Sequence, residues 1–188
     1  MLSDIDLSSR ALIKLGANPI SSFDEDSVEA EVSSTLYSST RDALLSAYPW
    51  TFAYAQVALA KLTVTPIADY SYAYQLPADF LRAVSIGSGE EGRGIEYRIA
   101  ERRLHSNQDG INLTYIFRPD ESAWPPFFDQ VMITRLSAEF CIPITESTSR
   151  NDVLARLADI EFARAKSIDS QQTSPSRVEG FSLIDVRA

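Results

Sequence analysis

The chain contains very few of the side chains on which most enzymes rely for chemistry. Its 188 residues include one cysteine, Cys141, and one histidine, His105. A single cysteine excludes an internal disulfide and a thiolate metal cluster, and one histidine beside it is too few ligands for zinc. Cys141 lies in an apolar stretch, which favours a small buried side chain over a nucleophile. We therefore expect no metal and no cofactor.

Long hydrophobic runs are also absent. No apolar run reaches the ~18 residues that a membrane helix needs, and the first residues lack the basic start and apolar block of a signal peptide. Seven glycines and nine prolines are too few for a fibrous or disordered chain, while 45% hydrophobic and 23% charged residues are ordinary for a globular protein. We expect a soluble cytoplasmic product of one domain, or one domain with an insertion.

Positive charge is scarce as well. The formal net charge is −9, and residues 1–50 hold eight acids against three bases. Residues 82–118 hold six arginines against five acids, so no long basic face exists. Affinity for nucleic acid through phosphate neutralisation is therefore not expected. An acidic protein can still line a channel through which DNA slides, because it repels phosphate.

Two helices are predicted in the first fifty residues. The first runs from Asp4 to Leu15, because Ser3 and Asp6 form a capping-box pattern and Gly16 supplies the stop. The second is the longest; it is expected to begin at a cap formed by Asp26 and Glu29 and to end at Pro49. Its apolar face is predicted to hold Val28, Val32, Leu36, Ala43, Leu44 and Ala47. Its other face is rich in serine and threonine, namely Ser33, Ser34, Thr35, Ser38, Ser39 and Thr40. That face suits either a neighbouring subunit or plain solvation.

The middle of the chain changes to a period of two. Tyrosines alternate with small or polar residues from Tyr70 to Leu76, as in a half-buried strand. Further strands are predicted at 81–86, 95–99 and 111–117, with a glycine-rich tip at 87–94 and a turn at 107–110. Residues 57–62 fit either a short helix or a strand. Residues 70–118 are thus predicted to form a small antiparallel domain inserted between helices.

Helices return in the last third of the chain. An amphipathic helix covers 127–140 and is expected to end at Pro143, and a last helix follows a cap formed by Ser149 and Asp152. Its predicted apolar stripe consists of Val153, Leu154, Leu157, Ala158, Ala165 and Ile168. A Ser/Pro linker then leads to an apolar end, 181–187, which we expect to dock on its own body or on a partner.

No catalytic arrangement stands out from this pattern. His105 lies beside two arginines near a hairpin tip, where a solvated histidine is the simpler interpretation. The tip at 87–94 lacks the Gly-Lys-Ser/Thr ending of a phosphate loop and carries two glutamates. The acids at 24–29 lack the spacing of a calcium loop and complement a helix N-terminus instead. The stripe of Tyr70, Tyr72 and Tyr74 favours a core or a subunit interface over base stacking, since no lysine or arginine is interleaved.

The order of the motifs along the chain is more informative than any one of them. A long helix leads into Tyr48-Pro49-Trp50-Thr51-Phe52-Ala53, and an aromatic strand follows in Tyr72-Ala73-Tyr74-Gln75-Leu76-Pro77-Ala78-Asp79. Later come Leu113-Thr114-Tyr115-Ile116-Phe117, Phe127-Phe128, Ile142-Pro143-Ile144-Thr145 and Ala163-Arg164-Ala165-Lys166. In this order, over nearly all 188 residues, the chain resembles the head-to-tail adaptor proteins of tailed bacteriophages, the tail tubular protein A type.

This resemblance implies a mainly α, α+β fold, in which about four helices (residues 1–69 and 119–170) form a bundle around the inserted β-domain at 70–118. It implies a structural virion protein that is not an enzyme. A dodecameric ring of copies would join the portal to the nozzle or another tail component, with DNA as passing cargo and no membrane contact. The protein would assemble in the host cytoplasm and reside in the virion.

The resemblance also assigns the residues expected to matter. An extended C-terminal arm, 171–188, would dock on the portal through Phe181, Leu183, Ile184, Val186 and Arg187. The structural motif would comprise Pro49, Trp50, Phe52, Tyr72, Tyr74, Leu76, Pro77 and Asp79. Two other functions remain open from the sequence: another tail-completion or plug protein, and a cell-wall hydrolase.

Overall fold

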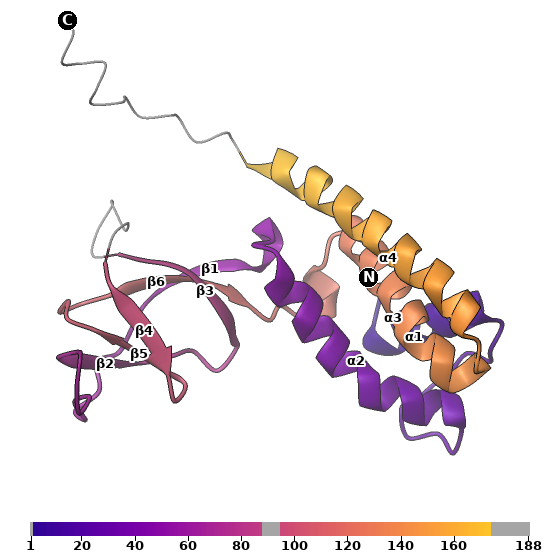
Figure 1. The fold of residues 1–188 in the computed structure, drawn as a ribbon, viewed down its shortest axis with the longest axis horizontal. Coiled ribbons are helices and arrows are strands. Elements are labelled where there is room, and N and C mark those ends of the chain that lie inside the picture. Colours follow the sequence, from indigo (N-terminus) through magenta and orange to yellow (C-terminus); the bar gives the residue numbers. More distant parts are fainter. Residues whose placement is uncertain (1, 88–94, 174–188) are drawn as a thin grey trace, which may run out of the picture.

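The computed structural model describes residues 2–87 and 95–173, and it confirms an α+β fold that is mainly α. In the described residues, four α-helices gather at one end of an elongated molecule and two small antiparallel sheets lie at the other (Figure 1). The expected C-terminal docking residues 181–187 and the glycine-rich tip beyond Gly87 fall outside the described residues. No helix in the described part is long and apolar enough to cross a membrane.

The first helix, α1 (Asp4–Leu15), forms as the local signals predict. The Ser3 side chain accepts from the Asp6 amide while the Asp6 carboxylate accepts from the Ser3 amide, which completes the capping box. Gly16 ends the helix with a φ of 73°, a left-handed conformation that costs glycine little. Both ends are thus fixed by neighbouring residues alone.

The second helix, α2 (Val28–Ala47), differs from the prediction at its start and on its faces. Ser27 is the N-cap and accepts from the Ala30 amide at 3.2 Å, so the predicted cap at Asp26 and Glu29 is wrong by one position. Ser33 and Thr40, predicted on the polar face, are buried, whereas Val28 is 60% exposed. Ser33 and Thr40 therefore lie on the covered side of the helix, which the hydrophobic pattern alone does not reveal.

The third helix, α3 (Pro126–Thr145), runs through Pro143, where the sequence predicts an end. The turn continues past the proline because Thr145 Oγ1 donates to the Cys141 carbonyl at 2.6 Å and the Glu146 amide donates to the Ile142 carbonyl at 2.9 Å. Pro143 removes one donor from the helical ladder, and the two bonds that follow it keep the last turn closed. This helix is buried on most sides and forms the centre of the bundle.

The fourth helix, α4 (Thr148–Asp169), packs chiefly on α3 and leads into a short 3₁₀ turn, η3 (Ser170–Gln172). Its N-cap is Ser147, which accepts from the Arg150 amide at 3.3 Å, so the predicted cap at Ser149 and Asp152 is too late. Only part of the predicted apolar stripe is covered. Ala158 and Ala165 are buried, whereas Val153 and Leu157 are exposed.

Six strands within residues 54–87 and 95–117 form the two sheets. In one sheet β1 (Tyr54–Ala58) and β3 (Phe80–Gly87) flank β6 (Asn112–Phe117); in the other β2 (Tyr72–Gln75) and β4 (Tyr97–Ala100) flank β5 (Arg103–Ser106). All pairings are antiparallel. The sequence does not predict β5, because arginine, histidine and serine are not typical strand residues. The turn before β5 lies at Glu101 and Arg102, which both have positive φ although neither is a typical turn residue.

The predicted domain boundary at residue 70 is too late. Residues 54–58 form β1, which pairs with β6 from Tyr54 opposite Ile116 to Ala58 opposite Asn112. The ambiguity at 57–62 therefore resolves as extended chain, and Lys61 bridges to Tyr74 beyond the end of β1. The pattern was ambiguous because β1 is an edge strand with alternating partial burial, so no clean apolar face marks it.

Two hydrophobic cores share β6. Ile116 faces the helical core, together with Trp50, Phe128 and the inner faces of α1, α2 and α3. Leu113 and Tyr115, from the same strand, belong to the core between the two sheets. The last strand of the β-domain is therefore also a wall of the helical bundle.

Candidate functional site at the domain junction

The first half of the expected structural motif forms a corner between the helices and the sheets. The chain leaves α2, turns at the exposed Pro49 and buries Trp50 completely, with Nε1–H donating to the Leu44 carbonyl at 3.0 Å. Rings from three parts of the chain surround the indole: Tyr48, Phe52, Phe127, Phe128 and Phe162. Such edge and tilted contacts add to the burial of apolar area. The corner fixes the direction in which β1 leaves the bundle.

A buried carboxylate holds the same corner from the far end of the chain. Asp169, which is 1% exposed, accepts from the Thr51 hydroxyl at 2.7 Å and from the Thr51 amide at 3.1 Å. That amide begins η1 (Thr51–Ala53), a 3₁₀ turn, so the carboxylate satisfies a helix-start donor. The C-terminal end of α4, from which residues 174–188 depart, is thereby tied to the start of the β-domain.

Charged side chains cross the junction on the α2 side. The Arg118 guanidinium, just after β6, donates to both carboxylate oxygens of Asp42 on α2, with Nε to Oδ1 at 2.9 Å. Arg41 donates to Asp42 at 3.0 Å and to Glu121 at 3.1 Å. Glu121 also accepts from the Tyr37 hydroxyl at 3.1 Å. Two carboxylates thus join α2 to the segment that leads from β6 into α3.

The protonation of this network is fixed by its partial burial. Burial raises the pKa of Tyr37 far above its ordinary value of 10.0, and the charge of Glu121 raises it further. Desolvation acts to lower the pKa of Arg41, but its hydrogen bonds to Asp42 and Glu121 outweigh that and raise it. The tyrosine therefore stays a neutral donor and the arginine stays charged across the physiological range.

The second half of the expected motif lies in the sheet core, apart from the first. Tyr74 is fully buried, and its hydroxyl donates to the Gln108 carbonyl at 2.6 Å and accepts from the Gly110 amide at 3.2 Å. Leu76 is buried beside it, and Tyr72 and Pro77 are partly covered. The Asp79 carboxylate accepts from the Tyr115 hydroxyl at 3.3 Å. These residues build the β-domain and do not meet Trp50 or Phe52.

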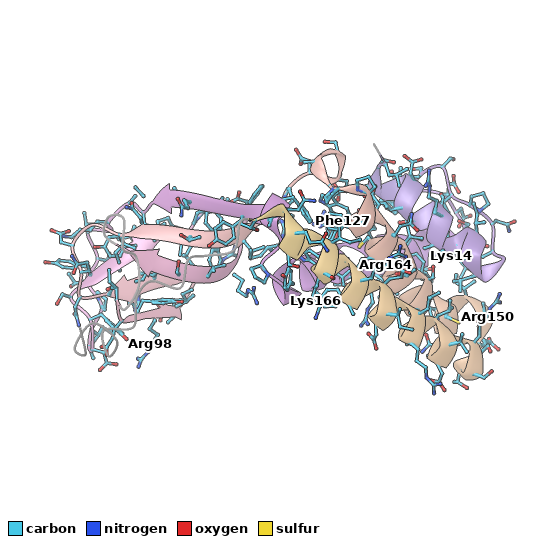
Figure 2. The ribbon with its side chains drawn as sticks, turned by 90° about the horizontal axis from the view of Figure 1, so that it is seen from above. Lys14, Arg98, Phe127, Arg150, Arg164 and Lys166 are labelled. Atoms are coloured by element: carbon cyan, nitrogen blue, oxygen red, sulfur yellow. The ribbon has the colours of Figure 1, made fainter. Side chains whose placement is uncertain are left out.

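At the end of the β-domain, tyrosine rings contact lysine and arginine side chains. The sequence does not predict these contacts. Lys61 Nζ lies 3.8 Å from the centre of the Tyr72 ring and 3.0 Å from Asp109. Arg98 lies over Tyr70 and pairs with Asp69 at 2.9 Å (Figure 2). Each cation is neutralised by an acid and occupies a tyrosine face. In this cluster both positive charges are paired with acids and a cation lies over one face of each ring, which disfavours the stacking of bases.

A groove of about 450 Å³ lies between α2, α3 and α4. Its lining is mainly apolar, with Leu36, Leu44 and Val131 among its walls, and the Arg135–Glu139 ion pair, 2.9 Å long, borders it. Ser39 and Thr40 supply the hydroxyl groups of its lining, and no histidine or cysteine stands among the described residues that line it. The groove suits an apolar side chain better than a reaction.

The residues with reactive side chains do not converge. His105 sits in β5, opposite Ala73 on one side and Arg98 on the other. Cys141 is buried on α3, with its sulfur 3.4 Å from Thr145 Oγ1. In residues 2–87 and 95–173 no three histidines, cysteines or acids cluster as metal ligands would. The residues that the sequence analysis missed at the junction are Thr51, Asp169, Asp42 and Arg118, which no local pattern marks.

No family model matches this chain, and no curated protein matches it.

Proposed function

We propose that the chain is a head-to-tail adaptor of a tailed bacteriophage, a structural protein and not an enzyme. Copies form a ring, expected to be a dodecamer, between the portal and the nozzle or another tail component. DNA passes through the ring without being held. The protein assembles in the host cytoplasm and resides at the head–tail junction of the virion.

The observation that carries this proposal is the braced corner at Trp50. It lies inside the motif on which the resemblance rests, and it connects a helical bundle to a separate β-domain at the other end of an elongated molecule (Figure 1). A ring component that contacts different partners above and below needs two such ends at a fixed angle. The Asp169–Thr51 contact and the Arg118–Asp42 ion pair both support that angle.

The charge of the chain supports the same role. A net charge of −9 makes a channel wall that repels phosphate, so passing DNA is not trapped. The cations at the end of the β-domain are paired with Asp69 and Asp109, which is consistent with a surface that contacts protein and not nucleic acid.

The arm completes the proposal. Phe181, Leu183, Ile184, Val186 and Arg187 follow α4 in sequence, and they are the residues proposed to dock on the portal. Twelve arms acting together would make a modest affinity of each arm effectively permanent, because avidity multiplies the individual contacts.

The test is to mix the purified protein with its cognate portal ring and to weigh the product by native mass spectrometry. Full-length protein is expected to add as a ring. A chain truncated before Gln171 is expected not to add, and neither is a full-length variant with Phe181→Asp and Leu183→Asp. A full-length protein that leaves the portal mass unchanged would overturn the proposal in favour of a plug or completion protein.

The hydrolase alternative has its own outcome. Release of soluble fragments from purified cell wall by the full-length chain, abolished by alanine at one or two acids without loss of folding, would replace the structural role with an enzymatic one. We expect no fragments to be released.

A further inference from the structure

The outer face of α4 combines exposed aliphatic side chains with arginines. Val153, Leu157 and Ile160 are 65%, 40% and 63% exposed and recur at i, i+4 and i+7, so they form one line along the helix. Three arginines flank that line. We call these six residues the arginine stripe: Arg150, Val153, Arg156, Leu157, Ile160 and Arg164.

Of the four acids of α4, Asp152 and Glu161 lie beside the arginine stripe, with Asp152 one turn before Arg156, whereas Asp159 and Asp169 lie away from it. Asp169 is buried against Thr51, and Asp159 lines the groove toward α2. Burial lowers the pKa of Lys14 on α1, and the charge of Glu161 opposes that shift. The Glu161 carboxylate lies 3.9 Å from the Arg164 guanidinium. Among the described residues neither Arg150 nor Arg156 forms an ion pair. An exposed aliphatic line flanked by Arg150 and Arg156, neither of which forms an ion pair in the described residues, indicates a helix-packing surface for an acidic partner.

A surface of matching chemistry exists on the same chain, at the start of α2. Val28 is 60% exposed and lies in the chain between the exposed Asp24 and Asp26 on one side and the exposed Glu31 on the other; we call these four residues the acidic patch. The other two acids of this segment already have partners: Glu25 accepts from Ser21 and Glu29 accepts from Asn18. The acidic patch therefore offers one apolar side chain and three uncommitted carboxylates.

The two surfaces cannot meet within one molecule. Figure 1 shows α4 along one side of the bundle and α2 along the other, with α1 and α3 between them. Arg150 and Arg164 of α4, labelled in Figure 2, are both exposed. A contact between the two surfaces must therefore join two copies head to tail, and a head-to-tail contact that closes generates a ring.

We propose that the arginine stripe of one copy docks on the acidic patch of the next. This interface rests on the ring proposed above, and it names the faces through which neighbouring copies meet. Packing of Leu157 and its aliphatic neighbours on Val28 excludes water, while the flanking arginines select the acidic end. The aliphatic line favours a protein partner over DNA, because phosphates would leave those side chains uncovered.

Disulfide trapping tests the contact without the portal. Two proteins, one with Val28→Cys and one with Leu157→Cys, are mixed under mild oxidation, and the cross-linked peptide is identified by mass. The native Cys141 is buried and stays out of the reaction. The mixed disulfide is expected to form roughly tenfold faster or more than with Ile67→Cys as the partner, because docking raises the local concentration. Ile67 is a matched control, since it is fully exposed on the β-domain. Equal rates would overturn the interface.

Charge reversal provides a second readout. Arg156→Glu and Glu31→Arg are each expected to weaken self-association in sedimentation velocity at high concentration, whereas a mixture of the two variants restores it. Arg102→Glu, which makes the same charge change in the β4–β5 turn, should leave association unchanged. All three positions are exposed, so the unfolding temperatures should match that of the unaltered chain.

The outcomes separate this inference from the proposed function. A portal that gains a normal ring from Arg156→Glu keeps the adaptor function and overturns the interface. A chain that shows the specific disulfide but adds nothing to the portal keeps the interface and overturns the adaptor function. If Arg156→Glu lowers binding to duplex DNA and leaves self-association unchanged, the arginine stripe is a nucleic-acid surface and the interface is overturned.

Discussion

The helical core and the sheet core of this molecule are built differently. The helical core brings together residues from α1, α2, α3, α4 and the Trp50 corner, and in the described residues five aromatic rings contact the indole while Trp124 packs on one of them, Phe128. The sheet core buries seven residues between two three-stranded sheets. Because stability rises with buried apolar area, the helical bundle is expected to contribute more to the free energy of unfolding than the β-domain does.

The difference shows that one chain can combine a stable helical bundle with a less stable β-domain. The β-domain uses the bundle as a support, since β6 contributes Ile116 to the helical core and Tyr115 to its own. Small sheets are marginal alone, so this shared strand and the junction contacts are what make the β-domain persist.

Removal of the corner aromatic is expected to have the largest effect. Trp50→Ala leaves a cavity within the helical core and removes the hydrogen bond to the Leu44 carbonyl, which costs about 3–5 kcal/mol. Urea unfolding followed by far-ultraviolet circular dichroism measures the loss. Tyr54→Ala is the control, because Tyr54 is an aromatic residue that is 44% exposed. Equal losses would mean that the bundle does not dominate stability.

The next prediction separates the two cores. Leu104→Ala empties the centre of the sheet core, at a cost of roughly 2–5 kcal/mol that falls on the β-domain first. Hydrogen exchange is expected to show lost protection for amides of β2 and β5 while α3 keeps its protection. Uniform loss in both regions would instead establish one cooperative unit.

The buried carboxylate is expected to matter less than either core. Asp169→Ala leaves the Thr51 amide without its acceptor and costs about 1–3 kcal/mol. Asp169→Asn keeps one acceptor oxygen and should lie between the alanine variant and the original chain in urea midpoint. An alanine variant as stable as the original would remove Asp169 from the set of contacts that brace the corner.

A pH dependence follows from Tyr37. Its pKa is raised in the folded state, so the unfolded chain loses this proton first, above the ordinary value of 10.0. The folded state then binds more protons, and stability falls as pH rises past 10. Tyr37→Phe should cost about 1 kcal/mol at neutral pH through the lost bond to Glu121. The same variant should weaken the alkaline decline in thermal unfolding between neutral pH and the alkaline range. An unchanged alkaline slope would contradict the assignment.

The smallest effect is expected at the exposed ion pair of the junction. Arg118 and Asp42 side chains are 40% and 30% exposed, so Arg118→Met should cost about 0.2–1 kcal/mol, and less at high salt. Arg98→Met is the matched control, because it breaks an ion pair within the β-domain. If hydrogen exchange of β1 rises only with Arg118→Met, the ion pair braces the junction; equal effects would deny it that role.

Local signals explain how much of this fold the sequence predicts. The bounds of α1 follow from Ser3 and Gly16, whose effects depend on residues within one turn. The start of α2 at Ser27 is missed because three acids nearby offer competing caps. The continuation of α3 through Pro143 depends on hydrogen bonds from Thr145 and Glu146, which compensate for the proline only once the helix has formed.

The junction is less predictable, because its partners are far apart in the chain. Trp50 and Tyr74 are marked as packing residues by their surroundings in the sequence, yet nothing there says that they enter different cores. Asp169 reads as the end of a helix, and its bond to Thr51 spans 118 positions. A single sequence does not predict such a long-range contact, whereas its local periodicity predicts the helices well.

The insertion of the β-domain into the bundle has a consequence for synthesis on the ribosome. All six strands lie between β1 and β6, so the β-domain is complete while α3 and α4 are still to be made. The helical core cannot close until Phe128 and the later residues emerge, because they supply its centre. The nascent chain is therefore expected to expose the apolar faces of α1 and α2 for the time needed to translate the rest, and to be most prone to aggregation during that time.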